Sequence, residues 1–422
     1  MWVTAGEAIV STQQLGHRSL LGLVVPHDVE MTTSVPDFDP ANLMGIIERV
    51  VAEGVRRPGD AAGERVAAMI YDRFVGLGLE FPVFRRREAL KAEPAREGDP
   101  PPGSPAASGW AYDPDETFAS STHLLPFSMS MQHTMDPAIE AGAVGFVGVL
   151  HGYPGDCRYY VPYDGLPRSI PGVYVNASQI RPLDEATGRG ATATIRVDAT
   201  RGTTTTHNVI GELAGVDDDW VVIGTHHDAP WASAVEDGSG IALVLAQAEA
   251  WSQVPAEQRP HRLVFLAAGA HMVAGAGTNG FVEAHAADMD RIVLEVHLEH
   301  AAVDTAVDGT PLDRVTPRWW FTTEVPWLEQ VVWDAIVTEG LDRSLMLTPD
   351  ALDHRPTTDG GFFHEVGVPL VNYLAAPWYL FDPADTLDKV DVPTLGSLSR
   401  AAWRIVAATR GLSPADARGS SG

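Results

Sequence analysis

Residues 223–240 read IGTHHDAPWASAVEDGSG. This stretch starts inside an apolar run, residues 220–224, that is typical of a buried strand. It ends in Gly-Ser-Gly, which opens a predicted helix at 239–251. Between the two lie a His-x-Asp, formed by His226 and Asp228, and an acidic pair. Open α/β sheets hold ligands and metals where a strand ends beside a helix N-terminus, so the stretch predicts both such a sheet and a site at its edge.

The chain around this stretch alternates between predicted strands and helices. Strands are predicted at 208–213, 220–224, 261–267 and 291–299, and helices at 239–251 and 278–287. Such alternation over residues 206–412 favours an α/β fold with a mostly parallel sheet and helices on both faces. Two further helices with apolar residues at helical spacing are predicted at 40–54 and 61–78.

The middle of the chain has a different texture. Residues 92–118 are rich in Pro, Gly, Ala and Glu, which is typical of a linker or long loop. Strand-like runs follow, with a helix end leading into the first of them, at 138–150, 170–175 and 193–197. We therefore expect two parts of one main domain and a β-rich insert between them, with the boundaries 1–120 and 206–422 for the main domain and 121–205 for the insert.

Composition narrows the class of protein. A length of 422 residues with 45% hydrophobic and 20% charged residues indicates a globular chain and favours two domains over one. The net charge of −27 argues against nucleic acid or an anionic membrane surface as a partner. The single Cys157 leaves no intrachain disulfide and excludes a Cys-rich zinc site. The apolar run at 20–25 is too short for a signal peptide, and we expect a cytoplasmic protein with no membrane segment.

Residues 226–240 resemble the pattern H-x-D followed by D-[DN]-x-S-G, which is that of the co-catalytic zinc aminopeptidases and glutamate carboxypeptidases. Thr358-Asp359, Gly367-Val-Pro369 and the segment 383–389 also fit this family. The β-rich middle segment resembles the protease-associated insert that many members carry. The resemblance implies a zinc-peptidase fold, in which five side chains hold two metal ions.

The ligands of one of these ions keep their chemistry here. The resemblance places His226 at the family's His, Glu299 at an Asp that ends a later strand, and Glu236 at the Asp that bridges the two ions. Asp237 is the alternative to Glu236, because the alignment can slip by one position. In the family the bridging residue precedes a cis peptide, and Glu236-Asp237 is expected to keep it.

The ligands of the other ion are replaced. Met272 stands at its Glu ligand and Phe381 at its His ligand, while His271 takes the place of the general base. We infer one divalent transition metal, Mn, Zn, Fe or Co, held by His226 and the two glutamates named above. Asp228 is expected to orient His226.

Three other histidines lie beside these candidate ligands. His227 and His300 are expected to be structural. His297 shares a strand face with Glu299, at a spacing of two, and could reach the ion. Whether His271 acts as a proton shuttle, contacts substrate or only packs is left open.

The altered metal set resembles that of the nitroanthranilate aminohydrolases, which have this peptidase fold. The resemblance implies hydrolysis of a small aromatic amine by nucleophilic aromatic substitution, in which metal-delivered hydroxide replaces the amino group and ammonia is released. Arg355 is the candidate for the nitro end of the substrate. An aromatic pocket wall, or simply core, is predicted for the tryptophans at 231, 319, 320, 327 and 378. The enzyme is expected to be a homo-oligomer.

Two other functions stay open at this point. One is an aminopeptidase or amidohydrolase with a shifted metal site. The other is a catalytically silent binding protein with a peptidase fold.

Overall fold

The structure is a computed structural model of the chain. It describes residues 34–80, 109–111, 135–150, 158, 167–198, 202–306, 309–351, 355–356 and 358–419. The predicted strands and helices of the main domain are confirmed, with bounds that shift by a few residues. Within these described residues, every helix is too short or too polar to cross a bilayer.

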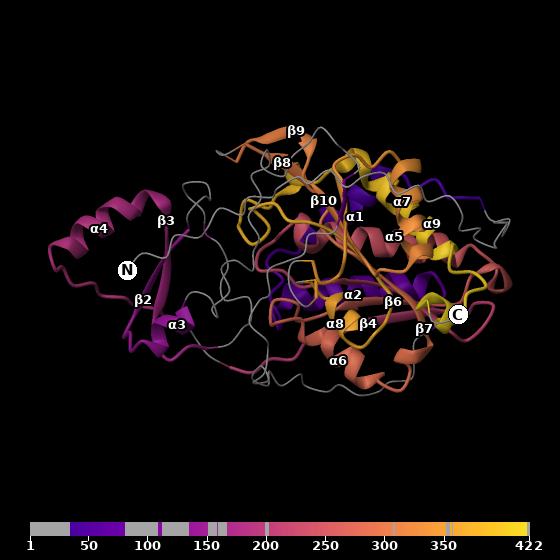
Figure 1. Cartoon of the computed structure of the whole chain (residues 1–422), viewed down its shortest axis with the longest axis horizontal. Coiled ribbons are helices and arrows are strands. Elements are labelled where there is room, and N and C mark those ends of the chain that lie inside the picture. The colour runs from indigo at the N-terminus through magenta and orange to yellow at the C-terminus, as the bar shows by residue number, and fades with distance from the viewer. Residues whose placement is uncertain are drawn as a thin grey trace. The chain divides into compact units, whose positions relative to one another are not determined.

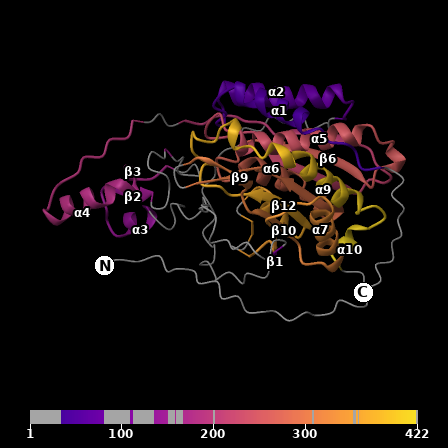
Figure 2. The ribbon, with the colours of Figure 1, turned by 90° about the horizontal axis from the view of Figure 1, so that it is seen from above.

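A pair of helices begins the described chain, α1 (Pro40–Ala52) and α2 (Ala61–Gly76). Asp39 starts α1 because its carboxylate accepts a hydrogen bond from the backbone N–H of Ala41, and Pro40 fits the first helical position. The apolar side of each helix is buried, as the helical spacing predicted. Figure 2 shows the pair as an indigo layer along one side of the molecule.

The centre of the fold is an eight-stranded sheet with the strand order β1-β11-β10-β12-β7-β5-β6-β4. Its strands are β1 (Gly109–Ala111), β4 (Val209–Leu213), β5 (Trp220–His226), β6 (Arg262–Ala268), β7 (Ile292–Leu298), β10 (Arg318–Thr322), β11 (Ser344–Leu347) and β12 (Leu370–Ala375). Strands β12, β7, β5 and β6 run parallel and form its middle, and β10 and β11 are also parallel. Three pairs are antiparallel: β4 with β6, β1 with β11, and β10 with β12. The sheet is therefore mixed.

Helices cover both faces of this sheet, as predicted (Figure 1). They are α5 (Gly240–Ser252), α6 (Ala276–Ala284), α7 (Pro326–Thr338), α8 (Gly361–Glu365), α9 (Leu395–Ala407) and α10 (Pro414–Ala417). Alternate side chains of β5 point to opposite faces of the sheet. Val221 and Ile223 belong to the larger core cluster, and Trp220 and Val222 belong to the smaller one. Because both faces are buried, the strand sequences are almost continuously apolar.

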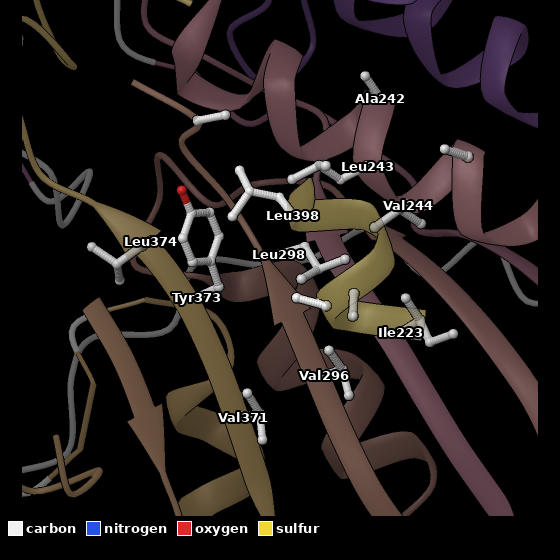
Figure 3. Packing of buried hydrophobic residues seen from close by; sticks show 14 of the residues in the cluster. Ile223, Ala242, Leu243, Val244, Val296, Leu298, Val371, Tyr373, Leu374 and Leu398 are labelled. Atoms are coloured by element: carbon white, nitrogen blue, oxygen red, sulfur yellow. The ribbon is translucent and has the colours of Figure 1, made fainter. Parts of the chain in front are cut away.

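The larger core is built in rows across the sheet. Ile223 pairs in register with Val296 of β7, which pairs with Val371 of β12. Figure 3 shows these three residues on neighbouring strands, with Leu243 of α5 and Leu398 of α9 packed over the sheet. This packing fixes the relative positions of the strand ends where the candidate site lies.

The middle segment contains α3 (Met135–Glu140), β2 (Phe146–Leu150), β3 (Gly172–Asn176) and α4 (Ile180–Gly188), and β2 and β3 pair in parallel. The strand predicted at 193–197 is wrong: these residues are irregular and mostly exposed, and none of the described strands pairs with them. The linker prediction for 92–118 is also wrong in part, because Gly109–Ala111 forms β1 and pairs with β11. The rest of that segment lies outside the described residues, and the division into a main domain and an insert stays a prediction.

A small hairpin follows β7 along the chain. It consists of β8 (Val303–Thr305) and β9 (Pro311–Val315), which pair antiparallel. It is separate from the main sheet and begins shortly after Glu299.

Candidate metal centre

The residues predicted to bind metal gather at the carboxyl ends of the parallel strands. His226 is the last residue of β5, and Glu299 directly follows β7. Glu236 lies in the irregular turn Val235–Ser239 that leads into α5, and its peptide bond to Asp237 is cis, as the resemblance implied. Parallel strands end at the same edge of a sheet, which is why residues so far apart in sequence meet here.

The donor atoms of these residues converge in a fully buried space. The His226 Nε2 lies 3.4 Å from Glu236 Oε1 and 4.0 Å from Glu299 Oε1. This nitrogen and all four glutamate oxygens have no hydrogen-bond partner among the described residues. Buried polar atoms are nearly always paired, and two buried carboxylates without donors are costly. A divalent cation between them would satisfy all five atoms, so this donor set fits a metal ion.

The alternative ligand Asp237 is engaged elsewhere. Its carboxylate accepts hydrogen bonds from the backbone N–H of Gly240, at 3.1 Å, and from the hydroxyl of Thr225. Burial raises the pKa of this carboxyl well above its usual range. Its oxygens therefore serve to hold the start of α5, whereas those of Glu236 are unsatisfied. The structure favours Glu236 as the donor.

Asp228 contacts His226 mainly through its backbone carbonyl. The His226 Nδ1 lies 3.0 Å from the backbone carbonyl of Asp228, and that carbonyl can only accept. The Asp228 carboxylate instead accepts the backbone N–H groups of His271 and Met272, both at 2.9 Å. The orienting contact thus comes from the backbone, and it leaves the His226 Nε2 lone pair facing the carboxylates.

The protonation states suit metal binding at neutral pH. Burial, together with the nearby imidazoles of His271 and His300, holds the pKa of His226 well below its usual value, so the ring is neutral. Burial by itself raises the pKa of the Glu299 carboxyl. The neighbouring histidines outweigh this effect and lower that pKa below its usual value. A neutral imidazole and an ionised carboxylate are the forms that bind divalent ions.

Two further imidazoles reach the same space. The ring of His271 stacks on that of His226 at 3.8 Å between centroids, and its Nε2 lies 3.7 Å from Glu236 Oε1. The His300 Nε2 lies 2.7 Å from Glu236 Oε2. Donor atoms of His226, His271 and Glu299 lie within 4.8 Å of one another, and so do those of His226, Glu236 and His300. The sequence analysis treated His300 as structural, and only its place next to Glu299 could have drawn attention to it.

His271 is held by a second carboxylate. Its Nδ1 lies 2.9 Å from Asp359 Oδ1, and the other oxygen of Asp359 accepts a hydrogen bond from Thr278. Burial opposes a charge on this ring, but Asp359 and the site carboxylates raise the pKa of His271 to about 10. These carboxylates thus favour the cationic form of His271, and its role as a proton shuttle stays a prediction.

His297 lies on the face of β7 that was expected. Its Nδ1 is 2.9 Å from Glu295 Oε1 and its Nε2 is 3.0 Å from Glu299 Oε1. The ring of His297 thus contacts the carboxylate of Glu299. Its direct contact with an ion stays a prediction.

The two positions at which the resemblance expects the other ion's ligands carry core side chains. Met272 is fully buried, and Phe381 has only 5% of its surface exposed. Both belong to the larger hydrophobic cluster. Neither offers a donor for a divalent ion.

Several solved structures share this architecture. A zinc aminopeptidase from Bacillus subtilis superposes with a TM-score of 0.61 at 18% identity, over 88% of this chain and 96% of that chain. An aminopeptidase from Aneurinibacillus sp. strain AM-1 gives 0.55 at 18% identity, over 88% of this chain and 93% of that one. A peptidase M28 precursor from Shewanella amazonensis SB2B gives 0.58 at 18% identity, with the same coverage of 88% and 93%. The chain has the fold of the zinc aminopeptidases.

This confirms the expected fold class, an α/β sheet of the zinc-peptidase type. No protein-family model and no curated protein matches the sequence. At 18% identity the likeness concerns the fold. The chemistry must therefore be argued from the residues of this chain.

The other predicted site residues make contacts of their own within the zinc-aminopeptidase fold. The guanidinium of Arg355 lies 4.0 Å above the ring of Phe362 and 3.4 Å from Glu365. Its charge is thus already neutralised, and a role at a substrate nitro group stays a prediction. Of the tryptophans, Trp319 and Trp320 are buried in β10 and belong to the core. Trp231 is half-buried and donates to the backbone carbonyl of Phe381.

Two buried charged residues, which the sequence analysis missed, hold the loop that presents Glu236. Arg56 donates to the backbone carbonyls of Ser233 and Glu236, at 3.0 and 3.2 Å, and to that of His227. Asp385 accepts the N–H groups of three residues, including that of Glu236 at 2.9 Å. This Arg56–Asp385 clamp satisfies an irregular buried backbone from both sides.

Replacing Asp385 with Asn is expected to weaken divalent-metal affinity by about ten- to a hundredfold, the usual effect of losing an outer contact of a ligand. The substitution keeps the shape but turns one acceptor oxygen into a donor, so the backbone N–H of Glu236 loses its partner. Isothermal titration with Mn²⁺ measures this. The control is Asp391→Asn, at a buried carboxylate whose side chain pairs with Arg318 and not with the loop that presents Glu236. Equal affinities in the two variants would contradict a positioning role.

Proposed function

We propose that this chain is a metal-dependent hydrolase whose single divalent ion is held by His226, Glu236 and Glu299. The observation that carries the proposal is the group of buried donor atoms without partners, one imidazole nitrogen and four carboxylate oxygens, at the carboxyl edge of the sheet. A histidine and two carboxylates are a ligand set for Zn, Mn, Fe or Co that leaves positions for water and substrate.

The apolar side chains at positions 272 and 381 support one ion over two. A second ion would need donors where Met272 and Phe381 are packed in the core. The substitutions are grouped. Both positions that would bind only one of the family's two ions are apolar here, and both positions that would bind only the other ion carry donors. A single-ion site explains this grouping better than random loss of ligands.

The residues around the site define how a reaction would proceed there. A divalent ion held by these residues would lower the pKa of water to about 7 and so would supply hydroxide at neutral pH. His271 takes the place of the family's carboxylate base, and Asp359 keeps it cationic. In that state His271 can donate a proton to a departing amine nitrogen. Burial of the carboxylates and imidazoles excludes bulk water from the reacting groups.

For the substrate, we propose a nitroanthranilate, whose aromatic amino group is replaced by hydroxyl with release of ammonia. The aryl C–N bond breaks and a C–O bond forms with the hydroxide derived from water. The amino group leaves as ammonia after taking up one proton from His271, and the proton released from water restores the charge of His271. A nitro group para to the amine takes up the negative charge that develops on the ring. The resemblance of the altered ligand set to the nitroanthranilate aminohydrolases supports this choice. We also propose that the protein forms homo-oligomers. Besides the ion, its only ligand in this proposal is the small aromatic amine.

The second candidate is an aminopeptidase with a modified site, which the fold of its structural neighbours favours. Against it stands the loss of the second ion's ligands and of the carboxylate base, on which peptide hydrolysis in this fold depends. A catalytically silent binding protein is the third possibility. It would have no use for two buried carboxylates whose oxygens make no hydrogen bond among the described residues, which cost stability unless an ion is bound.

One assay separates the three. The Mn²⁺- or Zn²⁺-loaded protein is expected to release ammonia from 5-nitroanthranilate and to leave leucine nitroanilide intact, with the chelator-treated protein as control. Cleavage of the anilide alone would favour the aminopeptidase. Turnover of neither substrate by protein with one bound ion would favour the silent binding protein.

A further inference from the structure

We propose that His300 is a fourth ligand of the ion, through its Nε2. This inference rests on the proposed single-ion site and adds a donor to it. His300 directly follows Glu299, at the end of β7, and only 5% of its surface is exposed.

The tautomer of His300 is fixed by a neighbouring strand. Its Nδ1 lies 2.9 Å from the backbone carbonyl of Ala375, the last residue of β12. A carbonyl oxygen can only accept, so Nδ1 carries the proton of that hydrogen bond. In the neutral ring this leaves a lone pair on Nε2. A backbone carbonyl that holds one ring nitrogen while the other faces the ion is the usual arrangement of a metal-bound histidine.

The Nε2 atom faces the candidate ligands and makes no hydrogen bond among the described residues. It lies 2.7 Å from Glu236 Oε2 and 3.8 Å from Glu299 Oε2. The shorter contact does not have hydrogen-bond geometry, and Nε2 has no hydrogen-bond partner among the described residues. Two ligand atoms bound to one ion at about 2.1 Å are separated by roughly 3.0 to 3.4 Å for octahedral or tetrahedral angles. The contacts of Glu236 with His300 and with His226, at 3.4 Å, lie close to this range.

The backbone explains how two consecutive residues reach one site. In an extended strand Glu299 and His300 would point to opposite faces of the sheet. His300 instead has a φ of 40°, in the left-handed region that a residue with a side chain rarely adopts. This turn brings its ring to the same side as Glu299, at right angles to the ring of His226. Strained backbone of this kind is kept where the side chain it places has a function.

The rival explanation is an ion pair, in which a protonated His300 only neutralises Glu236. That role predicts a change in stability when His300 is replaced, and no change in the electronic structure of a bound metal. A contact with substrate predicts a changed KM with unchanged metal binding. Both rivals can therefore be separated from a ligand by looking at the metal itself.

The experiment compares Co²⁺ binding and the visible absorption of bound Co²⁺ in the full chain and in His300→Ala and His300→Gln. We expect the Kd for Co²⁺ to rise by at least about tenfold in both variants, and the absorption bands to move because the coordination changes. Added imidazole is expected to restore the wild-type spectrum in His300→Ala, whose cavity admits it. Circular dichroism verifies that both variants are folded.

The matched control is His227→Ala. His227 directly follows a candidate ligand, as His300 does, but its Nε2 contacts the backbone carbonyl of His207. Its removal is expected to leave the Co²⁺ affinity and spectrum unchanged. Wild-type affinity and spectrum in both folded His300 variants would overturn the assignment of His300 alone. A wild-type chain that binds no Co²⁺ would overturn the proposed function as well.

Discussion

Replacing Glu299 with Gln is expected to remove tight metal binding and turnover together. The carboxylate is fully buried at the end of β7, and both of its oxygens are without a hydrogen-bond partner in the described structure. An amide of the same size keeps the packing but cannot supply the negative charge that a divalent ion requires. Loss of an outer contact already costs ten- to a hundredfold in affinity, so we expect an increase in Kd of more than about a hundredfold.

The measurement is a titration with Mn²⁺ and with Zn²⁺, alongside ammonia release from 5-nitroanthranilate. Glu339→Gln serves as the control, because Glu339 is a buried carboxylate paired with Arg400 and Arg404 outside the site. That control is expected to lose stability and to keep its metal. Unchanged turnover in Glu299→Gln would show that the ion is held by other residues.

Replacing Met272 with Glu is expected to destabilise the chain by about 3 to 5 kcal/mol, the cost of a buried charge without a partner. Met272 is fully buried in the larger core cluster, and the carboxylate of Asp228 is hydrogen-bonded to its backbone N–H. A second carboxylate there would be desolvated and would also repel Asp228. In the family the same position is a metal ligand, so this variant tests whether a second ion can still be held.

Thermal unfolding and metal analysis check this prediction. Met272→Leu is the control, and a swap of similar volume is expected to cost less than about 1.5 kcal/mol. Met272→Glu is expected to melt well below this control and to bind one ion per chain. Two ions per chain, with the stability of the control, would contradict the single-ion proposal.

The candidate ligands were accessible to sequence reasoning because each belongs to a local pattern. His226 ends an apolar strand, Glu236 precedes a Gly-Ser-Gly helix start, and Glu299 ends a second apolar strand. Once those strands are parallel, their ends must meet at one edge of the sheet. The apolar residues at Met272 and Phe381 could be read in the same way, since each stands in a recognisable segment.

Other features were not visible in any local pattern. The clamp joins Arg56 and Asp385, which lie near opposite ends of the chain and meet only through backbone groups of the loop between them. The neutralisation of Arg355 by Glu365 depends on how α8 is placed. The strand expected at 193–197 is not formed. A strand forms only beside a partner strand, and the sequence of the segment itself does not say whether a partner lies next to it.

His300 marks the boundary between the two kinds of information. It was expected to be structural, and the alternation of side chains along an extended strand would direct it away from Glu299. Its left-handed backbone and its hydrogen bond to Ala375 turn the ring back toward Glu236. The sequence by itself determined the α/β class, the edge of the sheet that carries the site and the residue types that gather there, because strand and helix periods are local properties. Only the tertiary structure decided which nitrogen and oxygen atoms face one another, because that depends on contacts between strands distant in sequence.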